Sequence, residues 1–346
     1  MILKTPSLIP FIFSLALPAF AADPAYTAPV GYTTAGGIQT GYTAPTGFLS
    51  ETLRSGMNLI GLRLHQSTIA TGIIASIGSD FAELTCPDRS GSGPATPALI
   101  PGTTYVLEIT SGAKVGVIQE ITRWQALRFT LSDDLAAAGV KPGDHFSLRK
   151  VATLNSVFDP RTTTLQKGES PESADTVLIP QGASFGEFRQ CFIILLPDGT
   201  TGWLDAATGE PVGDLPLVYP DGLIVQCKAP SDVVMTFSGE VKTGPTRSVV
   251  KPGLNLVASP FPSGAFLQDL GLADDLQKSD DPSEADRVWI AAGLSGQFNT
   301  YFLSAAGHWI STTDGEILAQ KTPVGSAILI ERIGPQALFC LGDSAK

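Results

Sequence analysis

Hydrophobic and polar positions alternate with a period of two in many short stretches of this chain. Clear examples are YVLEI at 105–109 and LRFTL at 127–131. This alternation places successive side chains on opposite faces of a strand. Glycine (36 residues) and proline (26) are abundant, and only 16% of residues are charged, which favours short strands joined by tight turns. We therefore predict an all-β protein built from antiparallel sheets, as β-sandwich or barrel-like modules.

One stretch of this pattern occurs twice. LQKGESPESADTVLIP at 165–180 returns 111 residues later as LQKSDDPSEADRVWIA at 276–291, with eight of sixteen positions identical and no gap. The match predicts an internal tandem duplication in the C-terminal half. In both copies we expect the proline to open a short turn, and Asp175 and Asp286 to accept backbone N–H bonds where that turn meets a strand. Because one copy alone can bury little apolar surface, we expect the two copies to pack as a pseudo-symmetric pair.

The remaining patterns divide the chain into five predicted segments. A signal peptide (1–21) precedes an extended Tyr/Thr/Pro-rich segment (22–54), a β-rich module (55–152), repeat copy 1 (153–250) and repeat copy 2 (251–346). The extended segment contains YTAP twice and suits either an edge strand or an ordered arm. In the β-rich module, a helical turn is expected from Asp133, as its N-cap, to Gly139.

The N-terminus predicts export. Lys4 precedes an apolar run at 8–17, and Ala19-Phe20-Ala21 offers small residues at both positions that a signal peptidase reads. A membrane span needs about 20 apolar residues, so this run is too short to be an anchor. We expect a protein of the periplasm, cell surface or extracellular space with no transmembrane span.

Composition and cysteine content narrow the chemistry. The chain has 22 Lys+Arg against 33 Asp+Glu, a net charge of −11, and no basic cluster, which excludes nucleic-acid binding. The even number of cysteines in an exported chain allows three disulfide pairings. The two copies do not share them, which favours buried free thiols instead. Both alternatives stay open for Cys86, Cys191, Cys227 and Cys340.

No pattern gives a supported catalytic or metal site. The sequence at 182–186 matches G-x-S-x-G around Ser184, but a strand-like segment follows it where a hydrolase needs a helix. His65, His145 and His308 are too few and too scattered for a catalytic metal. No cofactor is expected. Calcium is kept as an alternative, because oxygen-rich loops bind it and one short segment is rich in carboxylates: Asp274, Asp275, Asp280, Asp281 and Glu284.

Tryptophans are the candidate ligand contacts. Trp203 and Trp309 follow glycine-rich turns at similar places in the two copies. Exposed on one face, they could stack on sugar rings; buried, they would serve packing, as large aromatic side chains more often do.

Several motifs together carry a family resemblance. They are PVGY at 29–32, GMNLI at 56–60, YVLEITSG at 105–112 and PGDHF at 142–146, followed by Ala-Asp-x-Val and a Gly-led strand. In this order they resemble a paralogous family of exported proteins of unknown function from Verrucomicrobium-type bacteria. The resemblance spans nearly the whole mature chain and implies export and a modular β build. It supplies no catalytic residues.

The sequence thus predicts an exported, non-enzymatic structural or binding component of the cell envelope or extracellular space. Its partner would be an envelope or extracellular polymer. The alternative is a carbohydrate-binding or adhesin-like module, and the third hypothesis is a hydrolase.

Overall fold

The protein is all-β, as the alternation predicts. The computed structural model describes residues 45–86, 97–181, 186–196, 198–219, 221–242, 244–261, 264–292 and 296–342. Strands make up 49% of the structure and helices 4%. Every pair of named strands within these ranges runs antiparallel.

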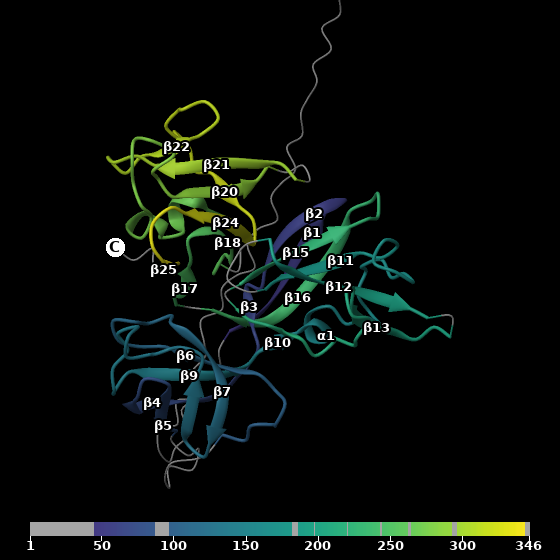
Figure 1. Cartoon of the computed structure of the whole chain (residues 1–346), viewed down its shortest axis with the longest axis horizontal. Coiled ribbons are helices and arrows are strands. Elements are labelled where there is room, and N and C mark those ends of the chain that lie inside the picture. Colours follow the sequence, from purple (N-terminus) through teal and green to yellow (C-terminus); the bar gives the residue numbers. More distant parts are fainter. Residues whose placement is uncertain are drawn as a thin grey trace, which may run out of the picture. The chain divides into compact units, whose positions relative to one another are not determined.

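Six strands form a closed barrel, drawn in blue in Figure 1. Around the barrel, in order, they are β4 (Thr68–Ile77), β5 (Phe81–Thr85), β8 (Arg128–Leu131), β7 (Ile118–Gln125), β6 (Tyr105–Ile109) and β9 (His145–Lys150). The period-two pattern turns one set of side chains inward, and Ile74, Leu107 and Phe129 are fully buried there. Closure leaves no unpaired sheet edge.

A five-stranded sheet, the first sheet, draws on both sides of the barrel in sequence. Its order is β13 (Thr201–Asp205), β12 (Phe188–Leu195), β11 (Thr176–Pro180), β15 (Gly222–Cys227) and β2 (Gly56–Gly61). Strand β2 precedes the barrel, whereas the other four strands follow it. The predicted module boundary at residue 55 therefore differs from the structure: the barrel begins at Thr68, because Gly56–Gly61 pairs with β15 instead.

A second five-stranded sheet lies wholly in the C-terminal part. Its order is β22 (Trp309–Ser311), β21 (Phe298–Leu303), β20 (Arg287–Ala291), β24 (Ala327–Arg332) and β18 (Gly253–Ala258). The two sheets have the same topology. Across each sheet, starting from β13 or β22, the first three strands stand in reverse chain order. The next strand (β15 or β24) follows these three in the chain, and the last strand (β2 or β18) precedes them.

Smaller sheets of two or three strands accompany each five-stranded sheet. Those of the first sheet are β1 (Thr46–Leu53), β16 (Val233–Val241) and β3 (Leu64–His65), with the pair β10 (Ala152–Thr153) and β14 (Pro216–Leu217). Those of the second sheet are β17 (Thr246–Val250) with β25 (Ala337–Leu341), and β19 (Ala265–Phe266) with β23 (Pro323–Val324). Strand β1 is an edge strand, which confirms that expectation for residues 46–53 of the extended segment. The rest of that segment lies outside the described residues.

In the described ranges, helical structure is limited to single turns. The helix α1 (Leu154–Val157) is closed by a capping box between Thr153 and Ser156, and the 3₁₀ turns η1 (Leu267–Asp269) and η2 (Leu272–Asp274) precede β20. The expected turn near residue 133 is capped by Asp134, whose Oδ1 accepts the Ala137 N–H at 3.0 Å. Asp133 was the wrong cap, because its own amide donates to Gln119 Oε1 and so faces the barrel.

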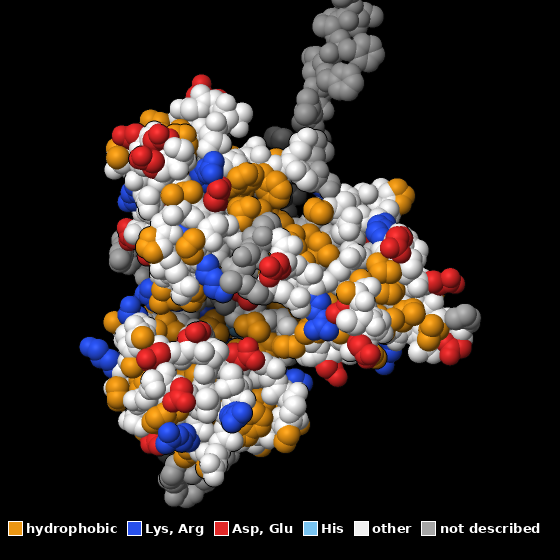
Figure 2. Space-filling view, in the orientation of Figure 1, with side chains coloured by type: hydrophobic (Ala, Val, Ile, Leu, Met, Phe, Trp, Pro, Cys, Tyr) orange, Lys and Arg blue, Asp and Glu red, His pale blue; other side chains and the backbone are white. Residues whose placement is uncertain are grey.

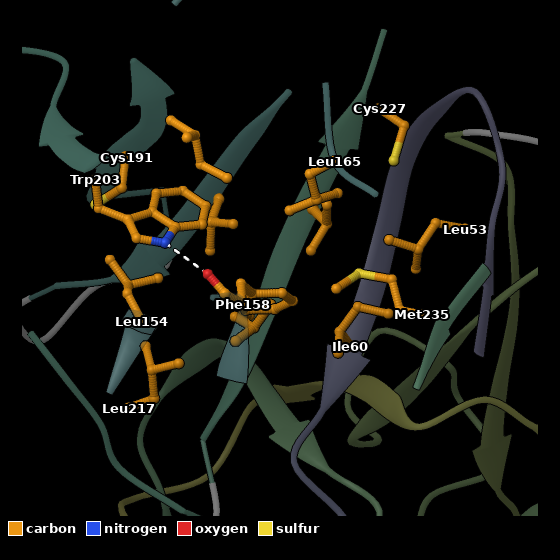
Figure 3. Packing of buried hydrophobic residues seen from close by; sticks show 14 of the residues in the cluster. Leu53, Ile60, Leu154, Phe158, Leu165, Cys191, Trp203, Leu217, Cys227 and Met235 are labelled. Atoms are coloured by element: carbon orange, nitrogen blue, oxygen red, sulfur yellow. Dashed lines mark hydrogen bonds between the residues drawn. The ribbon is translucent and has the colours of Figure 1, made fainter. Parts of the chain in front are cut away.

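Each sheet has its own core, and the two sheets also pack against each other. In the first core, Trp203, Phe158 and Leu154 lie together with both Cys191 and Cys227 (Figure 3). Between the sheets lies a separate cluster built around Ile224 of β15 with Leu256 and Leu329 of the second sheet. Each sheet thus packs one face against the other sheet and the opposite face on its own core.

All four cysteines are free thiols and buried. Burial raises the pKa of Cys191 to about 11 and that of Cys227 to about 12. Because the thiolate is the reactive form, these side chains behave as small apolar residues.

Candidate functional site

The predicted role of the two repeated aspartates is confirmed. Asp175 accepts the backbone N–H of Gln166 and of Lys228, both at 2.7 Å. Asp286 accepts the N–H of Gln277 at 2.8 Å and of Ile333 at 2.7 Å. Both carboxylates are buried, at 1% and 0% exposed, and so they fix the turn onto the next strand. They belong to the framework and not to a ligand site.

Two asparagines have matching partners in the two sheets. The side chain of Asn58 accepts the N–H of Arg54 at 2.8 Å and donates to its carbonyl at 2.8 Å. Asn255 does the same with Lys251, at 2.9 and 2.7 Å. These bonds close the turn that leads into β2 and into β18.

The tryptophans considered as ligand contacts are packed in the cores. Trp203 is 1% exposed and Trp309 is 8% exposed. Trp203 donates its Nε1–H to the Phe158 carbonyl at 2.9 Å, drawn dashed in Figure 3. Stacking on a sugar needs an open ring face, and neither indole offers one, so the packing interpretation replaces the stacking one.

A cavity of about 810 Å³ opens beside the edge strand of the first sheet. Three segments line it, at 155–161, 200–204 and 211–215, together with Arg189 and Ile194 of β12. The helix α1 brings Asn155 to it, and the following loop brings Asp159 and Arg161. The volume lies within the range of small-ligand sites.

The charged side chains of this pocket are balanced. Arg161 holds Asp159 with two side-chain bonds, Nε–Oδ1 at 3.1 Å and Nη2–Oδ2 at 2.8 Å. These bonds lower the pKa of Asp159. Arg189 donates its Nε–H to Asp205 at 2.6 Å, and Asp214 adds a second carboxylate to the lining.

Gly202 leaves open space over the strand that forms one wall of the pocket. A Cβ built at this glycine meets no atom within 4 Å, and its φ is ordinary. Neither backbone strain nor packing therefore requires a glycine there. A glycine inside a strand can mark a place where a ligand approaches the backbone closely.

The second sheet carries different residues at the corresponding positions. Trp203 pairs with Ile193, and Trp309 pairs with Leu303, so Gly202 corresponds to the exposed His308. By the same strand registers, Asn299 occupies the position that corresponds to Arg189, and Ser311 the position that corresponds to Asp205. The framework residues agree between the sheets, whereas the pocket residues do not.

A second group of charged side chains is buried between the barrel and its neighbours. Lys242 forms an ion pair with Glu108 of β6, and their side chains are 4% and 8% exposed. Arg149 of β9 lies 3.4 Å from the same carboxylate and also pairs with Glu240 of β16. Burial by itself would raise the pKa of Glu108, but the positive charge of Lys242 and its neighbours keeps it below its ordinary value.

His65 of β3 borders this cluster. Its ring lies 4.3 Å from the Tyr219 ring between centroids, and its Nε2 is buried with no hydrogen-bond partner. Burial, together with the cations Lys242 and Arg149, lowers the pKa of His65 to about 3, although Glu108 opposes the shift. The ring is therefore neutral at physiological pH.

The other candidates from the sequence are not brought together. In the described part of the chain no group of three or more His, Cys, Asp or Glu side chains could hold a metal ion. The acids considered for calcium bond to backbone N–H groups: Asp275 to Cys340 at 2.6 Å, Asp280 to Ala305 at 3.1 Å and Asp281 to Ser283 at 2.8 Å. Ser184 lies outside the described residues; the strands on its two sides, β11 and β12, pair as a hairpin.

Sequence reasoning missed the residues of the pocket. It named Trp203 for its ring and passed over Gly202 beside it, and it did not single out Arg189 or the pair of Asp159 and Arg161. The difference between Gly202 and His308, each directly before a tryptophan at corresponding places in the two sheets, is the signal that the sequence offers.

Charge over the surface is mixed. Figure 2 shows acidic and basic side chains interspersed on the visible face. Among the residues that the structure describes, no helix has the length and apolar character to cross a membrane. Comparison with family models, with curated proteins and with solved structures gives no match.

Proposed function

We propose that this chain is an exported, non-enzymatic binding component of the cell envelope or extracellular space, and that the pocket beside β13 is its ligand site. The observation that carries the proposal is the combination of an 810 Å³ cavity with an unfilled position at Gly202. The N-terminal pattern and the family resemblance support export.

The chemistry of the pocket supports binding without hydrolysis. A glycosidase needs a carboxylic acid whose pKa is raised, so that it can donate a proton to the leaving group. The pKa of Asp159 is shifted in the opposite direction, because Arg161 holds its carboxylate in the charged form. This carboxylate is suited to accept hydrogen bonds and not to act as a general acid.

We also propose that the two sheets are the copies of one duplicated module, with the barrel inserted into the first copy. The equal strand order and the matching bonds of Asp175 with Asp286, and of Asn58 with Asn255, support this history. Residues that both copies keep would then hold the fold, and residues that differ would carry the function of each.

Thermal unfolding in the presence of a chemically diverse set of small polar compounds tests the binding role. We expect one chemical class to raise the Tm of the full chain and to leave that of Gly202→His unchanged. The substituted imidazole would occupy the space that the ligand needs. If no chemical class raises the Tm of the original protein more than that of Gly202→His, the proposal is contradicted.

A further inference from the structure

Building on the binding function proposed above, we infer that the pocket beside β13 takes a neutral sugar chain. The charges of the pocket, its hydrogen-bonding groups and the protected strand edge all favour this class of ligand.

The charge balance points to an uncharged ligand. Two carboxylates, Asp159 and Asp214, and two guanidinium groups, Arg161 and Arg189, line the pocket, and both guanidinium groups are already paired, Arg161 with Asp159 and Arg189 with Asp205 outside the lining. An anionic ligand would face both carboxylates, and a cationic ligand would face both arginines. A neutral ligand avoids either penalty, because like charges brought together cost free energy.

The lining offers donors and acceptors of the kind that hydroxyl groups need. A hydroxyl both donates and accepts, whereas a carboxylate only accepts and a guanidinium only donates. The Asp159–Arg161 pair supplies both functions side by side on one rim, since its carboxylate and guanidinium already lie in contact. Asn155 and Thr201 add an amide and a hydroxyl.

Apolar side chains complete the surface. Leu204, Pro211 and Ile194 lie among the polar groups of the lining. A sugar ring presents hydroxyls at its rim and C–H groups on its faces, so it matches a lining in which both kinds of group alternate. The open space over Gly202 lets a ring approach the strand closely.

A peptide fits less well. Extended peptides are commonly held by pairing with a free strand edge. The outer edge of β13 is already occupied, because Asp205 donates its N–H to the Glu210 carbonyl at 3.0 Å and Trp203 accepts the Val212 N–H at 2.9 Å. Recognition at this site must therefore use side chains.

Calorimetric titration of the full chain with neutral tetrasaccharides of glucose, xylose and N-acetylglucosamine tests the inference. We expect at least one of them to bind, and Gly202→His to weaken binding by roughly tenfold or more, a loss of about 1.4 kcal/mol. Gly244→His is the control, since Gly244, like Gly202, has open space for a Cβ, and it lies outside the lining. This control should bind like the original protein.

A second variant tests the same site without changing Gly202, in case Gly202→His disturbs the fold. The double variant Arg189→Asn, Asp205→Ser installs the residues that stand at the corresponding positions of the second sheet. We expect it to lower the affinity for the same sugar while the circular dichroism spectrum stays unchanged. The protein could bind uronic-acid oligosaccharides or peptides and no neutral sugar, with Gly202→His weakening that binding. This result would overturn the ligand class but not the binding function. Sugar binding that is indifferent to Gly202→His would overturn the assignment of the site, and no binding by any probe would overturn the function as well.

Discussion

Buried titratable side chains in the described part of the chain are handled in two ways: some keep a charge that neighbouring groups satisfy, and others, such as His65, stay neutral. Asp175 and Asp286 stay ionised because amide N–H groups point at them, and in the second sheet Arg332 adds an ion pair to Asp286. His65 has no such partner at Nε2, and the low pKa keeps it neutral.

His65 makes stability depend on pH in a defined window. In the unfolded chain a histidine has a pKa of about 6.5, whereas the folded value is about 3. Between these values the unfolded state binds a proton that the native state does not bind. The free energy of unfolding therefore falls as pH drops from about 6.5 toward 3, by up to about 1.4 kcal/mol per pH unit, and is unaffected by this group at neutral pH.

Denaturant unfolding at pH 7, 5.5 and 4.5 checks this dependence. We expect His65→Phe, which keeps an aromatic ring beside Tyr219, to show a shallower loss of stability with acid than the original protein. The acidic residues away from this cluster titrate in both proteins and so cancel in the comparison, whereas the interaction of Glu108 with His65 is part of the effect measured. His308→Phe, at an exposed position, should leave the slope unchanged; equal slopes for all three proteins would refute the prediction.

At the scale of elements, glycine sets how closely the two sheets approach. Gly61 ends β2, pairs with Gly222 of β15 and faces the second sheet. A Cβ there would lie 1.9 Å from the Ser326 carbonyl oxygen and 2.9 Å from the Ala258 Cβ. The Gly61 N–H also donates to Ser326 Oγ at 3.2 Å, so the contact combines shape with a hydrogen bond.

Gly61→Val is expected to force the sheets apart and to lower the free energy of unfolding by at least about 1–3 kcal/mol, the range for overpacked sites. Chemical denaturation followed by tryptophan fluorescence measures the loss. Gly264→Val serves as the control, because a Cβ there meets no atom within 4 Å. A Gly61→Val protein as stable as this control would show that the sheets do not depend on the close approach.

Most of the secondary structure follows from local pattern, but the pairing of its elements does not. Alternation and turn residues predict β11, β12 and the turn before each repeated aspartate, because these features depend on neighbours within about ten residues. Asn58 lies in a sequence that resembles the start of the second copy, yet its strand pairs with residues 222–227, far along the chain. The barrel strands lie between them in the chain, and so local pattern does not show that Gly56–Gly61 joins the first sheet.

At the scale of the whole molecule, a few buried charges join the barrel to the remainder of the chain. Glu108 and Arg149 come from barrel strands, Glu240 from β16 and Lys242 from the segment that follows it. Glu240 also accepts the Thr68 backbone N–H at 3.1 Å, where the first barrel strand begins. Removing one partner from such a cluster leaves a buried charge without compensation.

Lys242→Ala should therefore cost about 3–5 kcal/mol, the range for broken buried ion pairs, with the retained Arg149 favouring the lower end. Scanning calorimetry is expected to show the barrel and the sheets unfolding separately in this variant and together in the original protein. Lys321→Ala breaks an exposed pair with Asp269 at 2.8 Å and should cost no more than about 1 kcal/mol. A single transition with unchanged Tm in Lys242→Ala would contradict the role of this cluster.

The sequence by itself determined the all-β class and the role of Asp175 and Asp286 at the turn before a strand. Both depend on alternation and turn chemistry, including the hydrogen bond of each aspartate to the residue nine positions before it. Only the tertiary structure decided that Trp203 is buried, that β2 joins the first sheet, and that Gly202, Arg189 and Asp159 share one pocket. Their environments depend on which distant strands pair and which faces become covered, and that choice minimises the exposed apolar surface of the whole chain at once.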